Sequence, residues 1–93
     1  MEGSFKATKG LIRVRLEVHS GHLSEVQISG DFFMHPEEGL WNLEQTLVGT
    51  EVSRNMILSK IKAFYEKWNI LTPGVIPEDF AEAIFRTIGT TLS

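Results

Sequence analysis

The sequence has no cysteine, little net charge and no long apolar run. Without cysteine the chain can form neither a disulfide nor a thiolate metal site, and it has no thiol nucleophile. A net charge of −3 argues against broad electrostatic attraction to nucleic acid or anionic lipid. No stretch approaches the roughly 20 apolar residues that span a bilayer, so we expect no membrane association. The first residues lack the pattern of a secretory signal, and the cytoplasm is therefore the expected location.

What is present suits a single globular domain over residues 1–93, with 42% hydrophobic and 23% charged residues. The charge is uneven along the chain. Residues 1–16 hold four basic side chains against one acidic side chain, and residues 31–51 hold five carboxylates with no Lys or Arg. Two interpretations remain open: both segments are solvated faces, or one of them meets a partner of opposite sign.

A β-hairpin is predicted over residues 11–29. Residues 11–18 alternate strictly between apolar and polar side chains, the period of a half-buried strand, and a second strand follows at about 23–29. A three-residue loop, 19–21, would pair Val14 with Val26 and keep the apolar side chains on one face. Such a loop needs a left-handed residue at its third position, where Gly21 stands. A further edge strand is expected near residues 5–8.

Helical periodicity begins after the hairpin. Three helices are predicted over residues 36–48, 54–68 and 77–88, with Pro36, Ser53 and Pro77 at their starts and Gly49 and Gly89 at two of their ends. The expected buried side chains are Leu40, Leu43, Leu47, Ile57, Ile61, Phe64, Trp68, Phe80, Ala83, Ile84 and Ile88. The predicted fold class is α+β: a small antiparallel sheet packed against three helices.

Signatures of an independent enzyme are missing from the sequence. It has neither of the common glycine-rich phosphate loops and no Gly-x-Ser-x-Gly elbow. Its histidines, His19, His22 and His35, are scattered over the hairpin tip and a loop, without the three or four ligands of a useful metal site. We therefore expect no catalytic residue and no metal site in this chain.

The segment Gly30-Asp31-Phe32-Phe33 stands between the hairpin and the first helix. Two consecutive aromatic side chains in extended chain point to opposite sides, so one can fill the core while the other meets a partner. The alternative is that both enter the core through a bend at Gly30. Asp31 suits either a turn or a partner contact. The outward-facing Arg13 and Arg15 are further candidates for an interface.

These features resemble the C-terminal accessory domain of lipoate–protein ligases. The resemblance rests on Gly10 opening the first long strand, on Gly-Asp-Phe-Phe after an alternating hairpin, and on a helix with Leu43-Glu44 and Leu47-Val48-Gly49. It extends from about Phe5 to Ile88. The predicted structural turns are at Gly10, Gly21 and Gly49. Many relatives have a glycine pair where this chain has Lys9-Gly10. The fold is also similar to that of iron–sulfur scaffold proteins, whose function needs cysteines that are absent here.

The resemblance implies a role as the small, non-catalytic subunit of a split ligase of the archaeal type. In that family a separate large domain holds the catalytic residues, and the small subunit is needed to activate lipoate with ATP before transfer to lipoyl domains. The expected partner is therefore a large catalytic subunit, in a heterodimer. ATP, Mg²⁺ and lipoate would be used by the complex and not bound by this chain alone. The alternative is a stand-alone interaction module without a role in lipoate activation.

Overall fold

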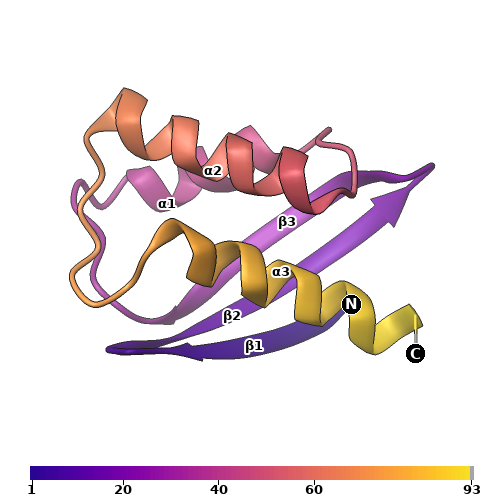
Figure 1. Cartoon of the computed structure of the whole chain (residues 1–93), viewed down its shortest axis with the longest axis horizontal. Helices are drawn as coiled ribbons and strands as arrows, with labels where there is room; N and C mark the ends of the chain where they lie inside the picture. The colour runs from indigo at the N-terminus through magenta and orange to yellow at the C-terminus, as the bar shows by residue number, and fades with distance from the viewer. Residues whose placement is uncertain (93) are drawn as a thin grey trace.

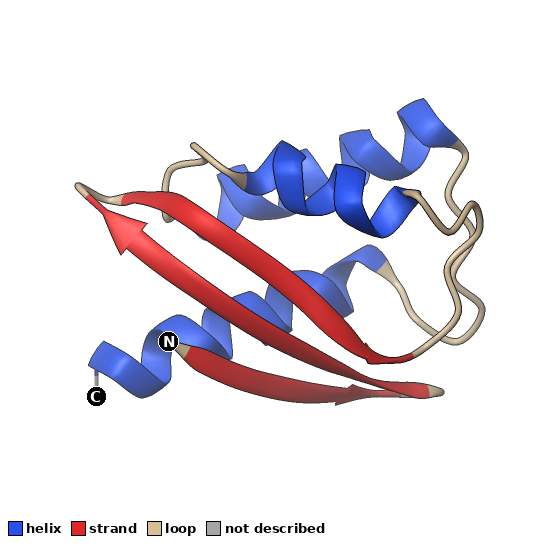
Figure 2. Cartoon of the chain, turned by 180° about the vertical axis from the view of Figure 1, so that it is seen from behind, coloured by secondary structure: helices blue, strands red, loops and turns tan. Residues whose placement is uncertain are grey.

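Three antiparallel strands form one sheet, and three helices cover one of its faces (Figure 1). The computed structural model describes the backbone of residues 1–92 and the side chains of residues 1–89. The elements are β1 (Glu2–Ala7), β2 (Gly10–His19), β3 (His22–Asp31), α1 (Gly39–Leu47), α2 (Arg54–Trp68) and α3 (Pro77–Leu92). Seen from behind, the strands lie in front of the helices (Figure 2). No helix within residues 1–92 covers this second face of the sheet, which we call the open face. The α+β prediction is confirmed.

The β2–β3 hairpin has a two-residue turn, so the predicted three-residue loop is wrong. His19 pairs with His22, and both turn residues have positive φ angles, 52° at Ser20 and 76° at Gly21, as a type I′ turn requires. The register then shifts between Glu17 and Val18, which leaves Ser24 as an extra residue in β3. Because of this bulge, the apolar side chains of β2 and β3 lie on the same face of the sheet, which is the result that the predicted three-residue loop would also have given. Val14 consequently pairs with Ile28 and not with Val26.

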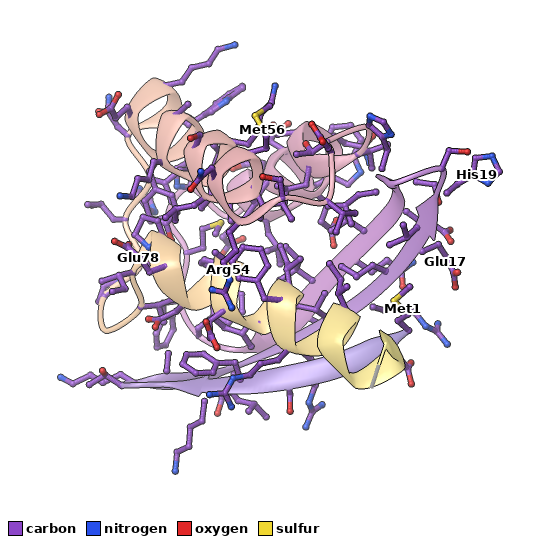
Figure 3. The ribbon with its side chains drawn as sticks, turned by 45° about the vertical axis from the view of Figure 1, so that its right-hand side comes forward. Met1, Glu17, His19, Arg54, Met56 and Glu78 are labelled. Carbon is purple, nitrogen blue, oxygen red and sulfur yellow. The ribbon has the colours of Figure 1, made fainter. Side chains whose placement is uncertain are left out.

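The edge strand β1 is longer and starts earlier than the predicted residues 5–8. It pairs antiparallel with β2, from Glu2 opposite Arg15 to Ala7 opposite Gly10. The chain end is tied to the same strand, because Met1 and Leu16 exchange two backbone hydrogen bonds of 3.0 and 2.9 Å. Figure 3 shows Met1 beside Glu17, whose carboxylate lies 3.8 Å from the terminal ammonium.

The other edge of the sheet, along β3, is covered from two directions. Leu23 exchanges backbone hydrogen bonds with the turn after α1, accepting from Gly49 and donating to Thr50. Farther along, the Glu44 carboxylate accepts a 2.6 Å hydrogen bond from the backbone N–H of Ile28. Glu44 therefore satisfies an edge donor that a neighbouring strand would otherwise take. Gly49 makes its turn possible with a φ of +89°.

Helix α1 begins at Gly39, three residues after the predicted start. Pro36 belongs instead to a hydrogen-bonded turn, in which Gly39 donates to its carbonyl oxygen at 3.0 Å. Gly39 packs closely under neighbouring side chains, since a Cβ there would lie 2.8 Å from Ile70 Cδ1 and 3.1 Å from Met34 Sδ. The helix ends at Leu47, two residues before Gly49, close to the predicted end.

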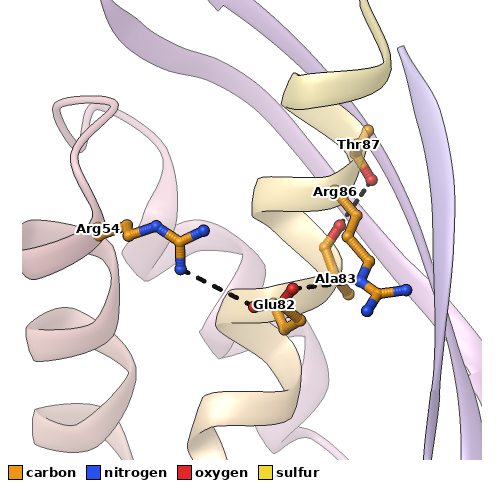
Figure 4. A network of polar contacts seen from close by, with 5 residues as sticks. All are labelled: Arg54, Glu82, Ala83, Arg86 and Thr87. Carbon is orange, nitrogen blue, oxygen red and sulfur yellow. Dashed lines mark hydrogen bonds and ion pairs between the residues drawn. The ribbon is translucent and has the colours of Figure 1, made fainter.

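Helices α2 and α3 pack against one another and enclose the core above the strands. Arg54 of α2 lies 3.9 Å from the Glu82 carboxylate of α3, which also contacts Arg86 at 3.2 Å (Figure 4). Two sequence expectations fail here. Trp68 is 43% exposed, because it lies in the last turn of α2 at the end of the molecule. Helix α3 continues through Gly89 to Leu92, since the backbone at this glycine makes no left-handed turn.

The core lies between the sheet and the helices and contains the predicted apolar faces. Among its fully buried side chains are Ile12 and Leu16 from the sheet, Leu43 from α1, Ile57 and Ile61 from α2, and Phe80 and Ile84 from α3. Within residues 1–92, no helix combines the length and the apolar character that crossing a membrane requires.

Candidate protein interface

Two glycines bring the segment after β3 close to the start of β2. Gly30 has a φ of +142°, and a Cβ there would overlap the carbonyl oxygen of Leu11. A Cβ at Gly10 would lie 2.6 Å from the Asp31 carbonyl oxygen and 3.0 Å from Phe32 Cβ. Gly10 therefore serves a close approach between two backbone segments. Together the two glycines fix the path of the chain as it leaves the sheet.

Phe32 and Phe33 point to opposite sides of that path. Phe32 packs against the core in an edge-to-face contact with Phe80, with ring centroids 5.4 Å apart and planes at 83°. Phe33 is 83% exposed, the most exposed of the large hydrophobic side chains within residues 1–89. The inward and outward pair predicted from the sequence is therefore present, and the alternative with both rings in the core is wrong.

A second segment, not singled out by the sequence analysis, lies beside this one. His35 and Leu71 exchange two backbone hydrogen bonds of 2.9 Å, which join the β3–α1 loop to the α2–α3 loop (Figure 1). Alternation along the first loop places Phe33 on the same side as His35, and His35 lies directly opposite Leu71. Leu71 is 63% exposed and Ile76 in the same loop 54%. We call the surface formed by Phe33, Leu71 and Ile76 the loop-end surface.

Buried polar contacts hold the α2–α3 loop in place. The Thr72 hydroxyl donates to the Val75 carbonyl oxygen at 2.7 Å and accepts from the Tyr65 hydroxyl at 2.8 Å, since its single proton is already used. Burial raises the pKa of Tyr65 to about 12. Lys9, in the turn before β2, donates its backbone N–H to Gly74 at 3.2 Å. The loop is thus anchored to both α2 and the sheet.

Carboxylates predominate in the two loops of the loop-end surface, and the Lys9 side chain lies against Gly74 of the α2–α3 loop. Residues 30–38 and 70–79, which contain the two loops, hold no Lys or Arg, and their carboxylates are Asp31, Glu37, Glu38, Glu78 and Asp79. Glu78 lies 3.7 Å from Lys62, and Asp79 accepts a hydrogen bond from the backbone of Ile76. Within the described part of the chain, the other three carboxylates have neither an ion pair nor a hydrogen bond.

Arg13 and Arg15 lie elsewhere, on the open face of the sheet. Arg13 stands opposite Ser29, and Arg15 opposite Gln27, along a shallow groove that is lined by the three strands and by Glu44 of α1. Arg15 lies 3.1 Å from Glu2, with both side chains more than half exposed. The structure therefore separates the two candidate groups: the arginines belong to a polar sheet face, and Phe33 belongs to an apolar surface between loops.

The histidines do not converge on one place. His19 projects from the hairpin tip away from the rest of the molecule (Figure 3). The His22 ring nitrogen Nδ1 lies 2.9 Å from the Ser20 carbonyl oxygen, and His35 is exposed in the β3–α1 loop. Among the residues that the structure describes, no three side chains of the metal-binding types form a group that could hold an ion.

Comparison with known proteins identifies the family. The family model for the C-terminus of bacterial lipoate protein ligases matches residues 1–84. Lipoate-protein ligase A subunit 2 of Thermoplasma acidophilum is 43% identical over 81 residues, which are 87% of this chain and 83% of that protein. A chain from the structure of an archaeal bi-partite lipoate protein ligase, studied with its lipoyl domain from the same organism, superposes with a TM-score of 0.82 at 42% identity, over 89% of this chain and 91% of that one. The chain therefore belongs to the family of lipoate protein ligase C-terminal domains.

Proposed function

We propose that this chain is the non-catalytic small subunit of a two-subunit lipoate–protein ligase. The observation that carries the proposal is the similarity to subunit 2 of the Thermoplasma ligase, since the two chains match over most of both lengths. Because that protein is a subunit and not a complete ligase, the similarity favours this role over a stand-alone interaction module. The partner is then a large catalytic subunit, and the indirect partners are the lipoyl domains that receive the product.

In the proposed complex, ATP and Mg²⁺ activate lipoate to lipoyl-adenylate on the large subunit. This chain alone binds none of the three. It acts on the large subunit by favouring the closed arrangement of mobile substrate loops, which excludes water and raises the population of the competent state. The tightly buried core and the anchored loops of this domain support that role, because a rigid surface can hold a mobile one in place. ATP is a cytoplasmic metabolite, so we place the complex in the cytoplasm.

The proposal is tested by measuring lipoyl-adenylate formation with purified components. The large subunit with lipoate and Mg-ATP is assayed with and without this chain, and this chain is assayed alone. We expect little adenylate from either protein and at least a tenfold rise in the rate for the mixture, saturating at one chain per large subunit. A large subunit that forms adenylate at full rate by itself contradicts the accessory role.

A further inference from the structure

We propose that the loop-end surface is where this chain docks on the large subunit, with Phe33 as the central anchor. This inference rests on the proposed function for the identity of the partner. Exposed apolar side chains scattered singly need no explanation, but a group of them on one surface indicates an interaction site. Here Phe33, Leu71 and Ile76 come from two loops that the backbone bonds of His35 and Leu71 hold together.

The rigidity of this surface favours binding. The Phe33 backbone is held on one side by the close approach of Gly30 to Leu11 and on the other by His35. Phe32 next to it is locked against Phe80. Leu71 and Ile76 flank the Tyr65–Thr72–Val75 hydrogen bonds. Little backbone freedom is therefore lost when a partner covers these side chains, and an aromatic ring in such a setting is the usual type of interface anchor.

The charge around the surface indicates the chemistry of the site that receives it. Asp31, Glu37 and Glu38 border the Phe33 segment without an ion-pair partner in the described part of the chain. A complementary site on the large subunit has an apolar pocket for Phe33 with Lys or Arg side chains around it. A second copy of this chain fits poorly, because two such surfaces facing each other would bring their carboxylates together.

The test compares the affinity of variants for the large subunit of the source organism, with isothermal calorimetry. Phe33→Ala should weaken binding by about 30-fold or more, and Leu71→Ala should weaken it less. Val48→Ala and Met56→Ala are the matched controls, because these exposed apolar side chains lie on other surfaces, and they should bind like the wild type. All variants should keep the wild-type thermal midpoint, since none of these side chains belongs to the core.

A second arm examines the acidic border. The double variant Glu37→Lys/Glu38→Lys should associate about tenfold more slowly at low salt, and the difference should shrink as salt is added. Sedimentation of this chain alone should show a monomer.

The outcomes separate the two proposals. If the wild-type chain neither binds the large subunit nor raises adenylate formation, the proposed function fails. If it does both and Phe33→Ala binds equally well, only the docking surface is wrong. If the wild-type chain self-associates and Phe33→Ala abolishes the self-association, the surface belongs to another partner. The same holds if Phe33→Ala loses binding to the lipoyl domain and keeps binding to the large subunit. Either result also overturns the inference.

Discussion

The loop-end surface and the open face of the sheet are both exposed, yet they differ in every property that matters for binding. The loop-end surface is apolar, is built from two loops joined by backbone hydrogen bonds, and has carboxylates around it. The open face holds long charged side chains such as Arg13 and Arg15, standing in rows along the strands. Solvated arginines lose rotamer freedom and hydration when a partner covers them, whereas an exposed ring on a rigid backbone loses little.

This difference shows why exposure alone does not identify an interface. An antiparallel sheet covered by helices on one face can leave its second face polar and in water, as the fold does here. An 83% exposed phenylalanine beside a half-buried one has no such general explanation.

Replacing Gly30 should damage the loop-end surface most. In Gly30→Ala the new methyl group overlaps the Leu11 carbonyl oxygen, and the φ of +142° is strained for alanine. We expect a loss of about 2–4 kcal/mol in the free energy of unfolding, measured by urea denaturation. The adjacent Ser29→Ala, on the open face, is the control and should change stability by less than about 0.5 kcal/mol. Equal stabilities for the two variants would show that the close approach at Gly30 is not needed.

Phe32→Ala and Phe33→Ala should differ in their effect on the free energy of unfolding. Phe32→Ala removes a ring that contacts Phe80 and should cost about 2–3 kcal/mol, below the range for a fully buried phenylalanine because Phe32 is only partly buried. Phe33→Ala should change the free energy of unfolding by less than about 0.5 kcal/mol. A large loss of stability in Phe33→Ala would mean that its ring supports the fold and is no free anchor.

The inward Phe32 and the outward Phe33 could be predicted from the sequence, because consecutive side chains of an extended chain point to opposite sides. The sequence also predicted the strands and most of the helical core, since the apolar spacing is regular in residues 11–18 and in α2 and α3. It could not predict that Leu71 lies beside His35, because no local sequence pattern shows that the β3–α1 loop pairs with the α2–α3 loop. The role of Glu44 at the β3 edge was missed for the same reason. The bulge at Ser24 does have a local signal, because the buried Leu23 and Val26 are three positions apart and a regular strand would place them on opposite faces.

Anchoring of the α2–α3 loop can be tested with Tyr65→Phe. Losing the hydrogen bond to Thr72 should cost about 1 kcal/mol and should weaken protection of the loop in hydrogen exchange. The pH dependence gives a second readout. Because the folded-state pKa of Tyr65 is raised to about 12 from 10, its contribution to stability is complete below pH 10 and is lost as the pH rises towards 12. The difference in stability between wild type and variant should shrink over that pH window, and a constant difference would contradict the burial of the hydroxyl.

The smallest effect is expected on the open face. Arg13→Ala and Arg15→Ala should each change stability by less than about 0.5 kcal/mol, because the pair between Arg15 and Glu2 is exposed and exposed ion pairs contribute little. Binding to the large subunit at physiological salt should also stay within about twofold of the wild type. A loss of affinity as large as that of Phe33→Ala would reverse the contrast and move the interface to the sheet.

The role of this chain in lipoate activation is tested most directly by measuring the two half-reactions of the ligase separately. In the first, the large subunit receives lipoate and Mg-ATP; in the second, it receives preformed lipoyl-adenylate and a lipoyl domain. If this chain acts by completing the activation step, adding it should raise the first rate at least tenfold and leave the second within about twofold. Equal stimulation of both half-reactions, or of the transfer step alone, would contradict a role in the activation step.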